Sequence, residues 1–208
     1  MNRQIATFLL LFIVSFYFSC QDNNVKKVKT EDYFKGYSLQ PINFLNKKAY
    51  LPSNYKKVNL NELGEMLRQN PELNSLDKLY YRMAIEAEKE TKKIAVLYVD
   101  SLDKKNSIWF IPAQYFPLKK EYVNDYVHLL ETNLFKQQES YGYSFERLES
   151  KFLTINGNQS IKVSYKRNFQ ENTIYQTQYI ITTTEFDTYS ITVTNNNPLD
   201  FQKILKSL

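Results

Sequence analysis

The sequence predicts an α+β fold, in which an antiparallel β-sheet is flanked by helices. Four segments rich in β-branched and aromatic residues follow one another in the C-terminal third, and short polar turns separate them. Amphipathic helical patterns precede and follow this run, and two compact apolar strands lie upstream of it. This order of elements is typical of a sheet whose neighbouring strands run in opposite directions.

The first elements of the predicted domain are extended segments followed by a helix. Residues 49–52 and 55–58 have strand character, interrupted at Pro52. Asn59 with Glu62 three residues later is typical of a capping box, with Asn as the capping side chain. The leucines of the following helix share one face, at Leu60, Leu63 and Leu67.

The middle of the chain combines helices with a hairpin. Apolar residues at helical spacing predict a helix over residues 75–89. Two apolar runs, residues 94–99 and 107–111, are joined by a Lys-Lys-Asn turn and predict an antiparallel hairpin. Residues 119–138 then predict a long amphipathic helix.

The C-terminal third predicts a β-meander closed by a helix. The four β-rich segments are residues 145–155, 159–169, 173–184 and 188–194. Asn156-Gly157 between the first two supplies the positive φ angles that a tight hairpin requires. Asn197 and Pro198 are typical of the cap and first position of a final helix.

The first nineteen residues have the pattern of a secretory signal. Arg3 is followed by an uncharged, mainly apolar run over residues 5–18, interrupted by Thr7 and Ser15, and Ser19 closes it. As a helix this run would span roughly 20 Å at about 1.5 Å per residue, less than the ~30 Å hydrocarbon core of a bilayer. We therefore expect a cleaved signal over residues 1–19, with a shallow permanent membrane span as the alternative.

Cys20 is the single cysteine, so it cannot form an intramolecular disulfide. Its place, directly after the apolar run and Ser19, resembles the lipobox of bacterial lipoproteins, although Tyr17 and Phe18 replace the residues usual there. The resemblance implies acylation of Cys20, a new N-terminus at that residue and attachment to membrane lipid. It implies a location in the cell envelope, in the outer membrane by preference, with a tether over residues 20–48. A cysteine that lies by chance near an ordinary cleavage site is the alternative.

A second resemblance concerns the predicted domain, residues 49–208. It rests on five segments, residues 153–157, 161–165, 175–179, 189–194 and 201–207, and on an upstream Tyr-Leu-Pro-Ser-Asn-Tyr sequence at residues 50–55. In these segments the chain is similar to the PsbP/Mog1-like superfamily. The resemblance implies an α/β/α sandwich. It supplies no catalytic residues, because the superfamily hosts unrelated roles on one fold.

Composition excludes several classes of function. The net charge of +5 comes from lysines scattered among acids, whereas a nucleic-acid surface needs basic residues gathered on one face. We therefore expect no nucleic-acid partner. The chain has four glycines and neither a P-loop nor a dinucleotide-binding motif, and we expect no cofactor.

His128, the single histidine, is the first candidate site residue. Glu121 and Asp125 precede it by seven and three positions on the predicted helix, so the three side chains share one side and could hold a metal ion. That side lies opposite the apolar face, which favours a solvated helix surface instead.

Carboxylate pairs are the remaining catalytic possibility, since a glycoside hydrolase needs only two carboxylates at a set separation. The available residues lie in or near the meander: Glu146, Glu149, Glu171, Glu185 and Asp187. The exposure of charged side chains to solvent in turns and at strand edges explains these carboxylates equally well. The sequence assigns no catalytic residue.

The leading hypothesis is a non-enzymatic envelope lipoprotein that binds a protein or glycan partner or assists an assembly. An envelope hydrolase with an unrecognised carboxylate pair is the alternative.

The tyrosines of the meander either pack in the core or form a ligand platform. They are Tyr165, Tyr175, Tyr179 and Tyr189.

Overall fold

A computed structural model describes the domain. It covers residues 33–69, 75–142, 144–169, 172–196 and 201–208. The folded domain is the unit of residues 36–208, so it starts before the boundary at residue 49 that the sequence predicts. Cys20 and the predicted signal lie outside the described residues, as do Asn197 and Pro198 of the predicted final cap.

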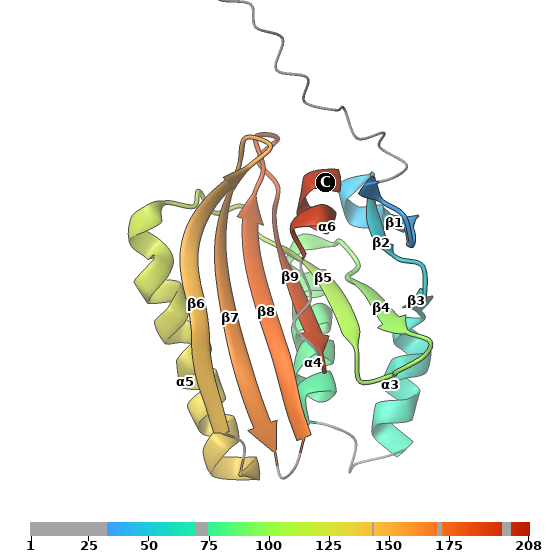
Figure 1. Ribbon diagram of the computed structural model, residues 1–208, viewed down its shortest axis with the longest axis vertical. Coiled ribbons are helices and arrows are strands. Elements are labelled where there is room, and N and C mark those ends of the chain that lie inside the picture. The colour runs from blue at the N-terminus through green and yellow to red at the C-terminus, as the bar shows by residue number, and fades with distance from the viewer. Residues whose placement is uncertain (1–32, 70–74, 143, 170–171, 197–200) are drawn as a thin grey trace, which may run out of the picture. The chain divides into compact units, whose positions relative to one another are not determined.

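The domain is built on a seven-stranded sheet with the order β3-β4-β5-β9-β8-β7-β6 (Figure 1). Every neighbouring pair of strands is antiparallel. The strands are β3 (Tyr55–Val58), β4 (Val96–Asp100), β5 (Ser107–Ala113), β6 (Ser144–Ile155), β7 (Asn158–Phe169), β8 (Asn172–Thr182) and β9 (Thr188–Asn195). The predicted α+β class is therefore confirmed, and so are the hairpin and the meander.

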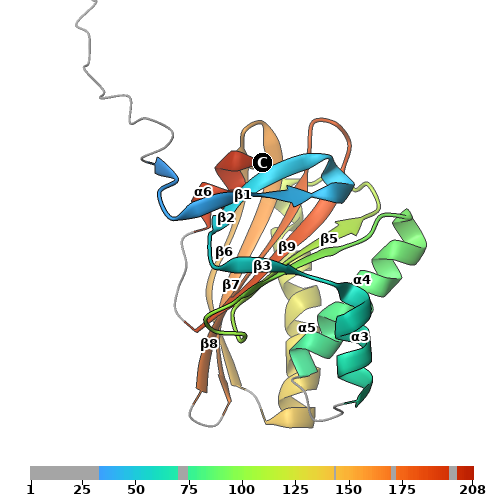
Figure 2. The same cartoon turned by 90° about the vertical axis from the view of Figure 1, so that its right-hand side faces the viewer.

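The helices divide between the two faces of this sheet (Figures 1 and 2). They are α3 (Leu60–Gln69), α4 (Ser75–Thr91), α5 (Val123–Tyr141) and α6 (Gln202–Ser207), and a short 3-10 turn η2 (Lys120–Tyr122) precedes α5. Alternation along β5 shows the division, because Ile108 and Phe110 pack with α6, whereas Trp109 and Ile111 pack with α3 and α4. Helix α5 covers β7 with a third cluster around Val163.

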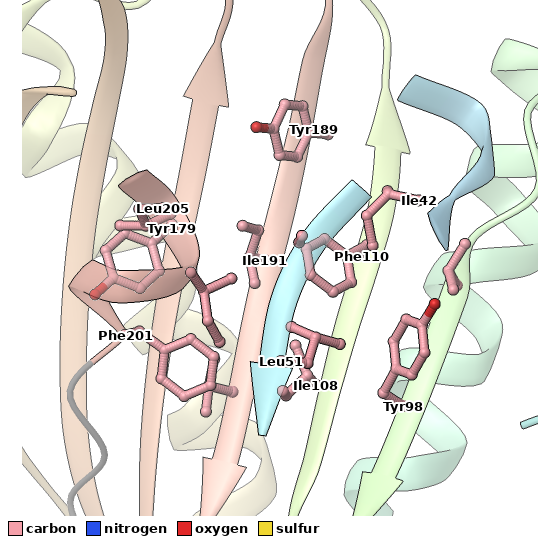
Figure 3. Packing of buried hydrophobic residues seen from close by; sticks show 14 of the residues in the cluster. Ile42, Leu51, Tyr98, Ile108, Phe110, Tyr179, Tyr189, Ile191, Phe201 and Leu205 are labelled. Carbon is pink, nitrogen blue, oxygen red and sulfur yellow. The ribbon is translucent and has the colours of Figure 1, made fainter. Parts of the chain in front are cut away.

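The face that carries α6 is completed by a β-hairpin at the start of the domain. Strands β1 (Tyr37–Ile42) and β2 (Lys47–Pro52) pair with each other and are joined by a 3-10 turn η1 (Asn43–Leu45). Ile42 and Leu51 are fully buried against β5 and β9, as Figure 3 shows. The predicted tether over residues 20–48 is therefore corrected, because its last part forms a strand, a turn and part of a second strand. Of these elements, the sequence predicts only residues 49–52, within β2, as extended, and it does not predict β1 or the turn.

All buried core residues in the described parts of the chain lie at Ile42 or beyond. The chain from residue 36 onward therefore holds all three clusters, and we infer that it folds without the preceding residues.

Two local predictions are confirmed in atomic detail. The side-chain oxygen of Asn59 accepts a hydrogen bond from the backbone N–H of Asn61 at 3.0 Å, and its amide reaches Glu62 at 3.5 Å. In the β6–β7 turn, Asn156 and Gly157 have φ angles of 52° and 81°, as a two-residue hairpin requires.

Candidate functional site: a cavity between two helices and the sheet

The predicted metal ligands do not form a site. Asp125 and His128 are exposed on α5, and Glu121 lies in η2 with its carboxylate 3.6 Å from the Lys119 ammonium. Within the described ranges, no group of three or more His, Cys, Asp or Glu side chains is placed to hold a metal ion.

The candidate carboxylates have basic partners. Glu149 contacts Lys151 and lies 2.5 Å from Lys162. Burial raises the pKa of Glu149, but the hydrogen bonds and charges of the two lysines outweigh it and hold the pKa below its ordinary value. This direction is typical of an ion pair and opposite to that of a general acid.

Of the other candidate carboxylates, two form ion pairs with different lysines. Glu185 pairs with Lys47 at 3.3 Å, and Asp187 pairs with Lys93 at 2.6 Å. Glu146 is exposed on β6, and Glu171 lies outside the described residues. The ion pairs of Glu185 and Asp187 join the β8–β9 turn to β2 and to the chain just after α4.

The tyrosines of the meander do not form one platform. Tyr165, Tyr179 and Tyr189 are all buried, and Tyr175 is half-buried. Tyr165 belongs to the cluster under α5, whereas Tyr179 and Tyr189 pack on the opposite face of the sheet. Core packing, the default for tyrosine on a half-buried strand, explains three of the four.

A cavity of about 280 Å³ lies between α4 and α5 over the strands β7 and β8. Side chains such as Met83 of α4 and Leu130 of α5 form its walls, and Glu86 and Asn133 are exposed residues of its lining. The strands contribute four side chains to it, from Tyr165, Arg167, Gln176 and Gln178. Four polar side chains under two amphipathic helices are unusual, since such positions are normally apolar.

Alternation along the strands places these four side chains together. Gln176 and Gln178 are two residues apart on β8, as are Tyr165 and Arg167 on β7, so each pair projects from one face of the sheet. Tyr165 is the register partner of Gln176. The four therefore form a continuous polar floor.

Hydrogen bonds fix the two amides of the floor. Arg167 donates from Nη1 to the side-chain oxygen of Gln176 at 3.0 Å. The amide nitrogens of Gln176 and Gln178 both donate to the hydroxyl oxygen of Tyr80 on α4, the second at 3.1 Å. Tyr80 therefore joins α4 to the centre of the sheet. The same hydrogen bonds fix the orientations of the two amide groups.

Tyr165 is different from the other floor residues. Its side chain is 1% exposed, and its hydroxyl has no hydrogen-bond partner among the described residues. Burial raises the pKa of this hydroxyl, as does the charge of Glu131, whereas Arg147 lowers it in part. The group is therefore a neutral hydroxyl at neutral pH. A buried hydroxyl without a partner costs about 1–3 kcal/mol, which a bound molecule that accepts its hydrogen bond would recover.

Comparison with solved structures identifies the architecture around this cavity. The solution structure of cyanobacterial PsbP (CyanoP) from Synechocystis matches with a TM-score of 0.50 over 77% of this chain and 80% of that chain, at 7% sequence identity. The domain has a PsbP-like fold. No family model and no curated protein matches the chain.

The polar floor lies within the PsbP-like fold but was missed by sequence reasoning. The signal was present, because Arg167, Gln176 and Gln178 stand at alternate positions of segments predicted to be central strands. Polar side chains on the covered face of such strands mark a site or a network. Which face of these strands is covered can be identified only when the packing of α4 and α5 is known.

Proposed function

We propose that this protein is a non-enzymatic binding module of the bacterial cell envelope, anchored in the membrane through acylated Cys20. What supports binding is the cavity between α4 and α5, whose lining includes Tyr165, and the hydroxyl of this residue has no hydrogen-bond partner among the described residues. Concave sites with an apolar wall and a few placed polar groups are the usual form of ligand pockets.

The cavity chemistry favours binding over hydrolysis. Glu86 is the single carboxylate in its lining among the described residues, and it is exposed. A carboxylate-pair mechanism needs a second carboxylate about 5–9.5 Å away.

The shape and polarity of the cavity define the class of ligand. A volume near 280 Å³ is small beside the ~300–1,000 Å³ of most ligand pockets, so it suits a small molecule. The lining residue Tyr165 supplies an O–H donor, so the ligand carries a hydrogen-bond acceptor such as a carboxylate, an amide oxygen or a hydroxyl.

The membrane anchor is supported by the N-terminal sequence. The apolar run over residues 5–18 is too short for an ordinary transmembrane helix, and Cys20 follows it directly. No helix in the described parts of the chain has the length and apolar character needed to cross a bilayer. The segment between Cys20 and Gly36 would reach roughly 50 Å when extended at ~3.4 Å per residue, which leaves the domain free to contact partners near the membrane.

The binding claim is tested by NMR on the chain that starts at residue 21. Acetate, acetamide and glycerol serve as probes, one for each acceptor type. We expect one of them to shift the amide signals of the cavity floor in a saturable way. Asn133→Trp places a bulky side chain in the lining and should abolish the shifts, whereas Asn124→Trp, exposed on the same helix but outside the lining, should retain them. No saturable shift with any probe, or equal shifts in both variants, would contradict the proposal.

The anchor is tested separately by cell fractionation. Wild type should sediment with membranes after a high-salt wash, and Cys20→Ala should appear in the soluble fraction. A Cys20→Ala protein that remains in the membrane would instead indicate an uncleaved signal that serves as the anchor.

A further inference from the structure

Three large aromatic side chains are exposed together at one end of the sheet. Tyr115 and Phe116 lie in the loop between β5 and η2, and Phe186 lies in the turn between β8 and β9 (Figure 1). They are 50%, 47% and 71% exposed, and we call them the aromatic patch. The rings of Tyr115 and Phe186 meet edge to face at 5.5 Å, and Phe116 lies 5.3 Å from Tyr122.

Hydrogen bonds hold the two loops of the aromatic patch together. The backbone N–H of Phe116 donates to the Thr188 hydroxyl at 3.0 Å. Its carbonyl oxygen accepts a hydrogen bond from the Thr182 hydroxyl at 2.6 Å. The aromatic side chains are therefore carried by backbone that is joined to β8 and β9, so their exposure is a property of the folded domain.

Phe186 is also held in an unfavourable backbone conformation. Its φ angle is +63°, in the left-handed region that glycine and asparagine tolerate and bulky residues avoid. A turn optimised for stability would place a small residue there. A strained backbone that presents a large apolar side chain to solvent is typical of a contact surface.

The surroundings of the aromatic patch carry an excess of positive charge. Three ion pairs border it, Lys47–Glu185, Lys93–Asp187 and Lys119–Glu121. Beside the three paired lysines in the sequence stand three exposed ones that form no ion pair among the described residues: Lys48, Lys92 and Lys120. The balanced pairs contribute no net charge, and Glu88, Lys89 and Glu90 just before Lys92 together add one negative charge, so a smaller positive excess remains at this end of the domain.

We propose that the aromatic patch docks on an anionic lipid surface. Aromatic side chains favour the headgroup region of a bilayer, and lysines near an anionic surface strengthen attachment. The contact rests on the proposed function in one respect, because the Cys20 anchor keeps the domain near the membrane, where weak docking is effective. Such docking would fix the orientation of a domain whose tether alone would leave it free to turn.

The test uses the chain from residue 21, which lacks Cys20 but retains every described core residue. It is sedimented with vesicles of phosphatidylcholine, alone or mixed with phosphatidylglycerol. We expect binding to the mixed vesicles that weakens with added salt. Tyr115→Ser combined with Phe186→Ser should reduce the binding constant about tenfold or more, the equivalent of one large apolar side chain.

Leu102→Ser is the matched control. Leu102 is 84% exposed in the β4–β5 loop, at the opposite end of β5 from Tyr115, and its loss should leave vesicle binding unchanged. The proposal is overturned if the chain does not bind mixed vesicles, or if the patch variant and Leu102→Ser bind equally. Crosslinking of the patch to an envelope protein without vesicle binding would also overturn it, in favour of a protein partner. None of these outcomes bears on acylation, because the tested chain contains no cysteine.

Discussion

The hydroxyl of Tyr55 on β3 donates a 2.5 Å hydrogen bond to the side-chain oxygen of Asn195 at the end of β9. Both side chains are buried, and 140 residues separate them in sequence. Strands β4 and β5 stand between β3 and β9 in the sheet, so this contact ties the edge strand to the centre. It is therefore a long-range hydrogen bond between two buried side chains.

Tyr55→Phe should destabilise the domain by about 1–3 kcal/mol, because the buried Asn195 oxygen would lose its hydrogen-bond donor. Urea denaturation gives the free energy of unfolding, with the fluorescence of Trp109 as the signal. Trp109 is the single tryptophan and is fully buried, so its emission should shift to longer wavelength on unfolding. An unchanged midpoint would show that the Tyr55–Asn195 bond contributes nothing.

Tyr165→Phe is the matched substitution with the opposite expectation. It removes a buried hydroxyl that has no partner among the described residues, so the free energy of unfolding should stay the same or rise slightly. Probe binding in the cavity should weaken in the same variant. A loss of stability as large as that of Tyr55→Phe would indicate that a tightly held water or protein group already satisfies the Tyr165 hydroxyl.

The domain should lose stability in alkaline solution. Burial raises the pKa of the Tyr98 hydroxyl from 10.0 to about 12 in the folded state, and this hydroxyl donates to the Pro41 carbonyl at 2.7 Å. Above pH 10 the unfolded chain therefore binds fewer protons than the folded one, and the free energy of unfolding falls until the pH passes the folded value. Denaturation midpoints measured between pH 9 and pH 12, roughly the span of the two values, should show this fall. Tyr98→Phe should make it shallower, and an equal slope in wild type and variant would contradict the assignment to Tyr98.

The carboxylate of Asp100 should stabilise the domain at neutral pH, and this stabilisation should be lost in acid. Burial raises its pKa, but hydrogen bonds from the Leu102 backbone and the Asn54 and Asn106 amides outweigh this and lower it below 3.8. Its stabilising contribution is therefore present above the ordinary pKa and is lost as the pH falls through the folded value. Asp100→Asn should be less stable than wild type at pH 7, and the difference should shrink toward pH ~2. A constant difference across that range would rule out the carboxylate charge as its cause.

The architecture illustrates what periodicity can and cannot predict. The alternation in residues 159–169 and the Asn156-Gly157 turn specify β7 and its hairpin locally, and the structure confirms both. The pairing of β5 with β9 joins segments far apart in sequence, and no local pattern encodes it. The β1–β2 hairpin was missed for a related reason, because its residues acquire their environment only when they pack on the assembled sheet.

The candidate sites also differ in whether a local sequence pattern or only the tertiary structure reveals them. Asp125 and His128 lie on the exposed side of α5, whereas Glu121 precedes this helix in η2, so the predicted side of one helix holds two of the three residues. The cavity floor depends on which face of β7 and β8 the helices cover, which is a property of the tertiary structure. The aromatic patch likewise combines Tyr115 with Phe186 from two distant loops. These aromatics are not singled out by the sequence, because no local pattern places the two loops side by side.

Phe186→Gly separates stability from function at the aromatic patch. Glycine relieves the left-handed backbone strain, so the free energy of unfolding should rise by about 1 kcal/mol. The same substitution removes the most exposed ring of the patch and should weaken vesicle binding. A less stable Phe186→Gly protein would indicate that ring contacts with Tyr115 outweigh the strain.

Intact mass spectrometry of the protein extracted from the membrane fraction tests the envelope anchor most directly. A polypeptide that begins at Cys20 and carries a lipid-sized mass, with no such species from Cys20→Ala, is the expected result. A mature chain with a free Cys20 thiol, or a chain that retains residues 1–19, would contradict the anchor.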